Sequence, residues 1–363
     1  MKKLVSILLS ISVLGCVAVG CSNQDSNSQN DVSEGNAASI STDSTSSEEN
    51  EAISTNESIE ADVAEEYASV TIDNFNSVTE YTEKPSSVIT LTLNSAEIIA
   101  ALGESDSIVG IARNNNVVDD VLPEYLNSLS NCAFPDEINT GIPTLEGMLG
   151  FSPDLIVANS YYFNVPVFGT AEDYTNNNAN LYIPEGTYVQ NSTIENTYND
   201  IRNLGKIFGK EDKAEELVNG MEERIAAVTE KVSGRDTVRV MAFDSTNEDM
   251  LNVAGGTGLE QNLIELAGGE NIFSDVEKQF GAVSYEEIIS RDPEIIVIHE
   301  YTIDETDAQT KIDLIKNSPD LANVSAVKND RIIIVPLFNI NPGLQNVDFV
   351  ETLAKELHSE VFE

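Results

Sequence analysis

Residues 144–157 have the sequence TLEGMLGFSPDLIV, and residues 284–297 have the sequence SYEEIISRDPEIIV. The two stretches align without a gap, and both contain a glutamate, a proline followed by an acid, and a final Ile-Val at corresponding places. Each stretch predicts a helix, a proline-containing turn and a buried strand. Two such units in one chain favour two α/β lobes of similar design over a chance similarity between common helix–strand units.

Apolar runs on either side of these units extend the α/β pattern through the chain. In the first half they are residues 88–93, 108–112, 155–158 and 181–183, after a predicted hairpin at residues 68–82. In the second half they are residues 238–243, 295–299 and 332–335. Continuous apolar runs separated by helical segments predict parallel strands that are covered on both faces.

The block between the two halves has a helical pattern instead. The segment Ser192-Thr193-Ile194-Glu195 predicts a capping box, and the helix that it starts ends at Gly209. A second helix starts at Glu211 and is roughly 22 residues long, or ~33 Å at the usual rise per residue. We therefore predict a helical connection of residues 192–234 between an N-terminal lobe of residues 68–191 and a C-terminal lobe of residues 235–363.

The N-terminus predicts a secretory signal peptide of residues 1–20. Lys2 and Lys3 precede an uncharged stretch, and Val17-Ala18-Val19-Gly20-Cys21 resembles a bacterial lipobox, in which the cysteine is lipidated. Cys16 is an alternative lipidation site, and an ordinary cleaved signal is an alternative to both. We prefer Cys21 because polar sequence begins directly after it. Cys132 is then alone, which excludes a disulfide framework and a cysteine metal cluster.

Residues 21–67 are rich in Ser, Asn, Asp and Glu and contain almost no large apolar side chain. This composition predicts a disordered acidic stalk between a lipid anchor and a folded body. The whole chain has a formal net charge of -43. Binding to a phosphate backbone requires a basic surface, so the charge excludes nucleic acid as a partner.

Further motifs lie in order along the chain, namely LE at 145–146 with PDLIV at 153–157, NLGKIFG at 203–209, LAGGENIF at 266–273 and AVKNDR at 326–331. With these motifs, the chain from about residue 68 to its end resembles the iron-complex and cobalamin class of ABC solute-binding proteins. The resemblance implies an α/β fold of two Rossmann-like lobes joined by a long, rigid connecting helix, with a ligand cleft between the lobes. It also implies that the chain binds and does not catalyse.

The resemblance further implies a role outside the cytoplasm. We expect a monomer, lipid-anchored to the outer face of the cell membrane, that captures an iron-siderophore-type chelate and delivers it to an ABC permease dimer with its ATPase. Haem and cobalamin are alternative ligands, and a surface sensor or adhesin is an alternative role. The chain contains no nucleophile elbow, zinc helix motif or Ser/His/Asp constellation that would indicate an enzyme, and no resident cofactor is expected.

Candidate ligand-binding residues follow from the position of the predicted strands, because ligands of α/β lobes lie beyond the carboxyl ends of the strands. Among the residues that this rule selects, we expect the ligand to contact Asn94, Ser95, Arg113, Tyr161, Tyr162, His299, Tyr301 and Asn339. Each has a purely structural alternative. The first two residues can cap the next helix, the arginine can pair with a nearby carboxylate, and the two adjacent tyrosines can pack in a core.

His299 ends a predicted buried strand, and His358 near the C-terminus is the other histidine of the sequence. His299 could contact chelated iron, hydrogen-bond a ligand carboxylate or simply pack at the strand end. A protein site for a bare metal ion would need several His and carboxylate ligands, so no such site is expected. The glycine-rich loop at residues 255–258 lacks a P-loop lysine and predicts a tight strand-to-helix turn.

Glu146 and Glu286 occupy equivalent places in the two repeated units. In proteins of the resembled class, the glutamate at this place in each lobe contacts arginines of the permease. The resemblance therefore implies that Glu146 and Glu286 dock the two lobes onto two like permease subunits. The alternative is that each acid only stabilises the N-terminus of its helix, which is worth about 0.3–1 kcal/mol.

Overall fold

The computed structural model describes residues 67–362 except residues 114, 137, 140 and 141. The predicted signal peptide, the lipobox cysteine Cys21 and the stalk up to residue 66 lie outside the described residues. Among the helices that the structure describes, none has the length and apolar content needed to cross a membrane.

The described part begins with the predicted hairpin. Strands β1 (Val70–Asn74) and β2 (Ser77–Tyr81) pair antiparallel through a two-residue turn. The turn residues Phe75 and Asn76 have φ values of 48° and 61°, as the turns that match the twist of a hairpin require. The Asn74 side chain exchanges two hydrogen bonds, of 2.8 and 2.7 Å, with the backbone of Ile183 and so fastens the hairpin to the following lobe.

The N-terminal lobe contains a four-stranded sheet in the order β4-β3-β5-β6, and all its strands are parallel. Its strands are β3 (Val88–Thr90), β4 (Ile108–Ile111), β5 (Leu155–Val157) and β6 (Asn180–Tyr182). Its helices are α1 (Leu93–Ala101), α2 (Pro123–Ser130), α3 (Leu145–Leu149) and α4 (Ala171–Thr175). The predicted parallel strands are confirmed, although β3 ends three residues before the predicted run does, because the Thr92 hydroxyl caps α1.

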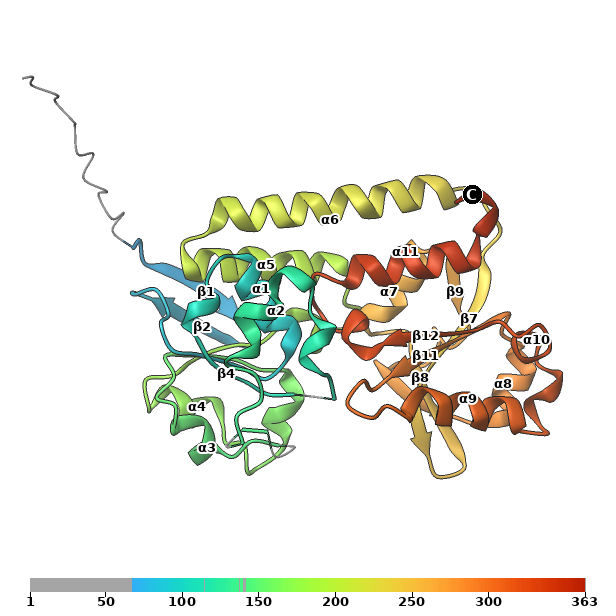
Figure 1. Ribbon diagram of the computed structural model, residues 1–363, viewed down its shortest axis with the longest axis horizontal. Helices are drawn as coiled ribbons and strands as arrows, with labels where there is room; N and C mark the ends of the chain where they lie inside the picture. Colours follow the sequence, from blue (N-terminus) through green and yellow to red (C-terminus); the bar gives the residue numbers. More distant parts are fainter. Residues whose placement is uncertain (1–66, 114, 137, 140–141, 363) are drawn as a thin grey trace, which may run out of the picture. The chain divides into compact units, whose positions relative to one another are not determined.

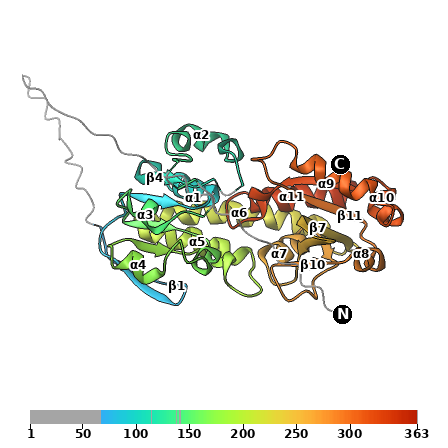
Figure 2. The same ribbon diagram turned by 90° about the horizontal axis from the view of Figure 1, so that it is seen from below.

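The C-terminal lobe contains a sheet in which β7 (Val238–Asn247), β11 (Ile295–Glu300) and β12 (Ile332–Pro336) are parallel neighbours, as predicted. Strand β9 (Gly269–Asn271) also pairs parallel with β7. Strand β9 was not predicted, and neither were β8 (Met250–Ala254) and β10 (Phe280–Val283), which add an antiparallel edge. The helices of this lobe are α7 (Leu259–Leu266), α8 (Tyr285–Arg291), α9 (Asp307–Asn317), α10 (Ser325–Lys328) and α11 (Asn346–Leu357). Figure 2 shows the elements of the two lobes from below.

Two helices connect the lobes, as predicted. Helix α5 (Ile194–Phe208) ends at Gly209, which has a φ of 64°, and α6 (Glu211–Val232) has 22 residues. The capping box of α5 is one residue later than predicted, because the Asn196 side chain, and not Glu195, accepts from the Thr193 backbone at 2.9 Å. Figure 1 shows α6 running along both lobes, beside α5 in one and α11 in the other.

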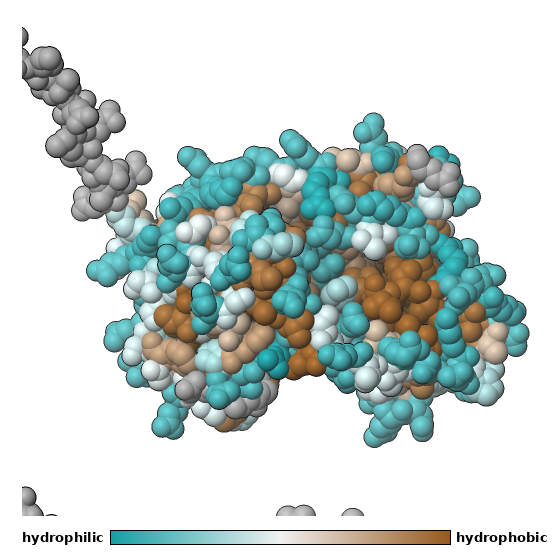
Figure 3. Space-filling view, in the orientation of Figure 1, coloured by the Kyte–Doolittle hydropathy of each residue, from teal (hydrophilic) through white to brown (hydrophobic). Residues whose placement is uncertain are grey.

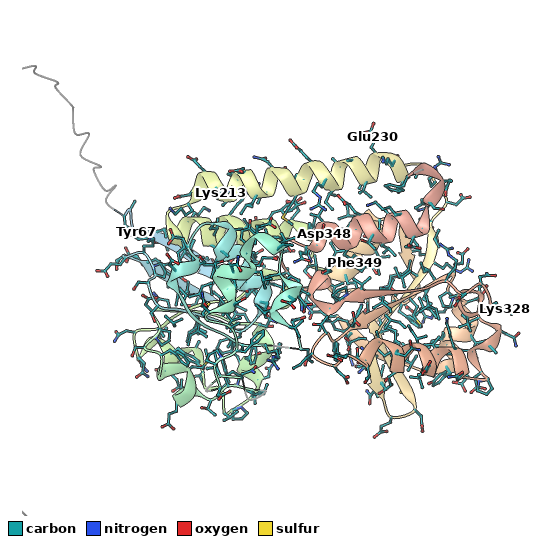
Figure 4. All side chains as sticks on the ribbon, viewed as in Figure 1. Tyr67, Lys213, Glu230, Lys328, Asp348 and Phe349 are labelled. Atoms are coloured by element: carbon teal, nitrogen blue, oxygen red, sulfur yellow. The ribbon has the colours of Figure 1, made fainter. Side chains whose placement is uncertain are left out.

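Close packing holds α6 in this position. A side chain at Gly205 of α5 would bring its Cβ to 2.5 Å from the Cβ of Ala214, so the glycine lets α5 and α6 approach. In Figure 4, Asp348 and Phe349 mark α11 below α6. Asp348 pairs with Arg224 of α6 at 2.5 Å, whereas Phe349 is fully buried. One apolar core includes buried residues of α5, α6, α11 and both sheets, so the lobes are not independently packed bodies.

Not all apolar side chains lie inside. Figure 3 shows an apolar area over the part of the C-terminal lobe where Figure 1 labels β11 and β12. Strand β12 is the last strand on that side of the sheet, and Ile334 in it is 43% exposed.

Candidate functional site

A cleft of about 450 Å³ lies between the two lobes and is lined by both of them. The N-terminal lobe contributes Asn115, Asn159, Ser160, Tyr161, Gly186 and Thr187. The C-terminal lobe contributes Asp244, Gly258, Leu259, Glu260, Gln279, Phe280, Tyr301, Leu337, Ile340, Asn341 and Pro342. Most of these residues follow the carboxyl ends of parallel strands, where ligand sites of α/β sheets are found.

The N-terminal wall is built from the segments that follow β5 and β6. Ser160 joins these segments, because its backbone N–H donates to the Thr187 hydroxyl at 3.2 Å and its own hydroxyl donates to the Thr187 carbonyl at 2.6 Å. Asp200 of α5 is buried and accepts hydrogen bonds from the Glu185 backbone and the Tyr182 hydroxyl. Burial raises the pKa of Asp200 well above its usual range, although both hydrogen bonds oppose the rise.

The two adjacent tyrosines have different environments. Their rings stack with centroids 4.2 Å apart, but Tyr161 is 41% exposed and lines the cleft, whereas Tyr162 is 1% exposed and belongs to the core of the N-terminal lobe. Our prediction that both rings meet the ligand therefore needs correction for Tyr162. Its ring supports the ring of Tyr161 from below, and only Tyr161 offers an aromatic surface to a bound molecule.

The glycine-rich loop brings the start of α7 to the C-terminal wall. Its Gly255 and Gly256 donate backbone hydrogen bonds of 2.8 Å to Gln279 and Val276. A Cβ at Gly256 would clash with the backbone of Ser274, so only glycine allows the loop to pass this close to Ser274. The predicted tight turn is confirmed, and it places Leu259 and Glu260, the first two residues of α7, on the cleft.

His299 lies beneath this wall and not on it. The imidazole is fully buried; Nε2 lies 2.7 Å from Glu260 Oε1 and Nδ1 lies 3.5 Å from Asp244 Oδ1. Phe280, which lines the cleft, meets the imidazole edge to face with centroids 6.1 Å apart. Direct contact between His299 and a ligand is thus contradicted, because both ring nitrogens already face carboxylates and no part of the ring is accessible.

The charges of this group are coupled. Burial opposes ionisation of His299, but Glu260 and Asp244 together raise its pKa to about 9, so the imidazole is an imidazolium near neutral pH. Burial would raise the pKa of Asp244, but the hydrogen bond and charge of His299 outweigh it and lower that pKa. Two acidic side chains therefore flank a single imidazole at the cleft wall.

Tyr301 is the other sequence-predicted residue that lines the cleft. Its hydroxyl donates to Asp244 at 2.9 Å, and burial and the Asp244 charge raise its pKa. The Lys311 ammonium lies 4.0 Å from the centroid of the ring and is anchored by the His299 carbonyl at 2.5 Å and by Asp307 at 2.7 Å. Contacts to both the hydroxyl and the ring therefore fix the side chain of Tyr301.

The remaining predicted binding residues do not line the cleft. Asn94 is buried, and its amide donates to the Phe338 carbonyl of the other lobe at 2.8 Å; Ser95 is buried and bonded to the Thr92 cap. The Arg113 guanidinium stacks 4.6 Å from the Phe134 ring centroid. The backbone carbonyl of Asn339 accepts a hydrogen bond of 2.9 Å from the side-chain amide of Asn346. These residues follow strand ends as predicted. After a strand end, however, some side chains line the cleft and others pack behind the lining.

Sequence reasoning missed most of the C-terminal wall. Leu259, Glu260, Gln279 and Phe280 lie on α7 and on the unpredicted strand β10 or next to it, so the strand-end rule did not reach them. The glycine-rich loop before α7 was the one signal in the sequence that could have pointed to Glu260. Among the lining residues that the structure describes there is no lysine or arginine. No group of three or more metal-ligating side chains occurs in the described part of the chain.

The lobes also touch beside the cleft. The Thr302 hydroxyl donates to Asp120 at 2.5 Å, and the Ile303 backbone N–H donates to the Asn115 carbonyl at 3.3 Å. Glu97 of α1 is fully buried at this junction, where Oε1 accepts from the Gln345 amide at 2.9 Å and from the Leu122 backbone at 2.6 Å. Burial raises the pKa of Glu97 to about 7, although both hydrogen bonds oppose the rise.

We expect Glu97 to make the folded state less stable as the pH rises from about 4.5 to about 7. The folded state holds the proton more tightly than the unfolded state, so raising the pH through this window removes about 3 kcal/mol from the free energy of unfolding. The substitution Glu97→Gln keeps the acceptor oxygen and removes the titration. Urea unfolding at pH 5 and pH 8 should show a smaller loss in the variant than in the wild type; equal losses would contradict this account.

Comparison with known proteins agrees with the two-lobed geometry. The model of the periplasmic binding protein family matches residues 88–337, which is more than half of the chain. The chain belongs to the periplasmic binding protein family.

This binding protein is similar to several characterised proteins. It is 23% identical over 290 residues to a cobalamin-binding protein of Halobacterium salinarum, covering 79% of this chain and 73% of that one. It is 25% identical over 263 residues to a petrobactin-binding protein of Bacillus subtilis, covering 70% of this chain and 76% of that one. The crystal structure of a periplasmic binding protein from Veillonella parvula superposes with a TM-score of 0.71 at 26% identity, covering 80% of this chain and 98% of that one.

Membership of this family indicates that the protein acts in transport. The protein is the substrate-binding component of an ABC importer. Its role is binding in transport and not catalysis, and substrate-binding proteins of this class act outside the cytoplasm.

Proposed function

We propose that this binding protein captures an iron-siderophore-type chelate in the cleft between its lobes and delivers it to a membrane permease. The observation that carries the proposal is the cleft itself, which has contributions from both lobes and aromatic surfaces at Tyr161, Phe280 and Tyr301. A site with apolar surfaces and a few polar groups suits a metal chelate, whose outer surface has the same mixture. The likeness to a petrobactin-binding protein supports a siderophore.

Cobalamin is the second candidate. It is supported by the likeness to a cobalamin-binding protein and by the side-chain amides of Asn115, Asn159, Gln279 and Asn341 in the cleft lining. Amides can both donate to and accept from the amide groups at the edge of a corrin.

Calorimetric titration of the full chain tests the proposal. The panel contains ferrioxamine B, an iron complex of 2,3-dihydroxybenzoate, haemin and cyanocobalamin. We expect one of these complexes to bind with one-to-one stoichiometry, and tyrosine fluorescence to report the same event, because the chain has 11 tyrosines and no tryptophan. If no member of the panel binds, a chelate is not the ligand.

We also propose that the protein is a monomer tethered to the membrane through Cys21, as the lipobox predicts. In cells that carry the full chain, labelling with a fatty acid should mark the wild type and fail to mark the variant Cys21→Ala. The matched variant Cys16→Ala should be labelled like the wild type. Labelling that persists in Cys21→Ala and disappears in Cys16→Ala would move the anchor to Cys16.

Docking of the permease is proposed for Glu146 and Glu286. Each is exposed at the second residue of its helix, α3 or α8, and each helix is capped by the preceding Thr144 or Ser284 hydroxyl. Because the hydroxyls already cap the helices, both acids are free to meet a basic partner. We expect the double variant Glu146→Gln/Glu286→Gln to retain chelate affinity and to lose most uptake. The control is Glu172→Gln, another exposed first-turn acid, in α4; normal uptake by the double variant would refute docking.

A further inference from the structure

The carboxylates of the C-terminal wall are not equally satisfied. Asp244 Oδ1 accepts from the Tyr301 hydroxyl at 2.9 Å, and Oδ2 accepts from the Ser245 hydroxyl at 2.9 Å. Glu260 is different, because Oε1 is bound to His299 at 2.7 Å while Oε2 is buried and has no hydrogen-bond partner. The residue is 4% exposed and lines the cleft, and its unpaired oxygen is buried within the wall that this residue helps to form.

A buried carboxylate oxygen without a partner destabilises the empty protein. Leaving such a group unpaired is unfavourable, and more so when the group is charged. A ligand that donates a hydrogen bond to Glu260 Oε2 recovers this energy on binding, and a ligand without a donor does not. The position of the carboxylate is set in advance, since Nε2 of the buried imidazolium of His299 holds the other oxygen.

The surrounding charges favour the same kind of ligand. The group formed by Asp244, Glu260 and His299 contains two acids and a single imidazole, and the described lining of the cleft contains no lysine or arginine. The nearby Lys311 is occupied, because its ammonium bonds to the His299 carbonyl and to Asp307. An anionic chelate would face like charge at a partly desolvated wall, which is unfavourable.

We propose that Glu260, held in place by His299, determines the specificity of the cleft by accepting a hydrogen bond from an N–H group of the ligand. The protein then selects chelates that carry amide or ammonium groups over anionic chelates without an N–H donor, such as dicarboxylate tetrapyrroles. Hydroxamate siderophores and corrinoids both have the required chemistry. This inference rests on the proposed function, because it assumes that the cleft binds a chelate.

Competitive titration of the full chain separates the classes. Ferrioxamine B carries amide N–H and ammonium groups, and cyanocobalamin carries amide groups; the iron complex of 2,3-dihydroxybenzoate and haemin are anionic. We expect one of the two N–H-bearing probes to bind at least about 100-fold more tightly than either anionic probe. Which of the two binds distinguishes a siderophore from a corrinoid. An anionic probe that binds as tightly as the better N–H-bearing probe would overturn the inference and leave the proposed function intact.

The variant Glu260→Gln tests the residue itself. It keeps one acceptor oxygen and removes the charge, and we expect the affinity for the preferred probe to fall about 10- to 100-fold, as for other hydrogen bonds to a charged group. The affinity for the anionic probes should stay the same or rise. Glu265→Gln on the exposed side of the same helix removes an equal charge away from the cleft and should change neither affinity.

Each outcome bears on a different claim. An unchanged ratio of affinities in Glu260→Gln, measured on protein whose thermal unfolding remains cooperative, would overturn the role of Glu260. Should Glu260→Gln fail to fold, the ratio measured on the wild-type chain still decides the ligand class. Binding of none of the four probes would instead refute the proposed function, and the specificity inference would fail with it.

Discussion

Replacing Asn346 with alanine should destabilise the folded protein by about 3–5 kcal/mol, because four buried hydrogen bonds are lost together. Asn346 is the first residue of α11 and is completely buried. Its amide donates to the carbonyls of Asn339 and Asn341 at 2.9 and 2.7 Å, and its oxygen accepts from the Gly343 backbone and the Thr197 hydroxyl at 3.1 Å each.

The same substitution should weaken chelate binding. Residues 339–343 include Asn341 and Pro342 of the cleft lining, and their conformation depends on the Asn346 side chain. Urea unfolding measures the stability, and titration at a temperature where the variant is folded measures the affinity. The matched control is Asn199→Ala, an exposed position on α5, which should cost less than about 0.5 kcal/mol. A loss below 1 kcal/mol in the Asn346 variant would show that this network is not needed.

Tyr162 and Tyr161 should give opposite results when each is changed to alanine. Tyr162 is 1% exposed and packs against Phe168 at a centroid distance of 5.1 Å, so its removal leaves a cavity that costs about 3–5 kcal/mol of stability. Tyr161 is 41% exposed, so its removal should cost little stability and instead weaken chelate binding by about 1–3 kcal/mol. Thermal unfolding and calorimetric titration of the two variants separate the effects.

Conservative variants that retain the ring serve as controls for this comparison. Tyr162→Phe retains the ring in the core and should recover most of the lost stability, and Tyr161→Phe should recover the stacking surface. If Tyr161→Ala binds the chelate as well as the wild type does, its ring does not contact the ligand. If Tyr162→Ala unfolds at the wild-type temperature, the ring does not support the N-terminal wall.

The fold was predictable where the apolar pattern is continuous. Strands β7, β11 and β12 are parallel neighbours and are apolar over several residues, and α6 shows an apolar face over its whole length, so periodicity located all of them. Strands β8 and β10 were missed for a physical reason. Met250–Ala254 and Phe280–Val283 form an antiparallel edge in which exposed and buried residues mix, and β8 reaches β7 through a turn at Glu248, which has a φ of 54°.

The location of the site was predictable from the sequence, but the burial of each candidate side chain was not. The carboxyl ends of the strands form the cleft, and Tyr161 and Tyr301 line it. Periodicity places a residue at a strand end, but the fold of the other lobe decides whether the side chain meets the cleft or its supporting layer. For this reason His299 and Asn94 proved to be buried supports, and Glu260, which lies at the start of a helix, was not a candidate.

Hydrogen–deuterium exchange of the full chain, with and without the probe that binds most tightly in the panel, tests most directly that a chelate is held between the lobes. We predict slower exchange on both walls of the cleft, at residues 159–162 and 186–187 of one lobe and at 258–260 and 340–342 of the other. Exchange in the part of α6 that lies away from the cleft should not change. Protection confined to one lobe, or located away from these segments, would contradict a site between the lobes.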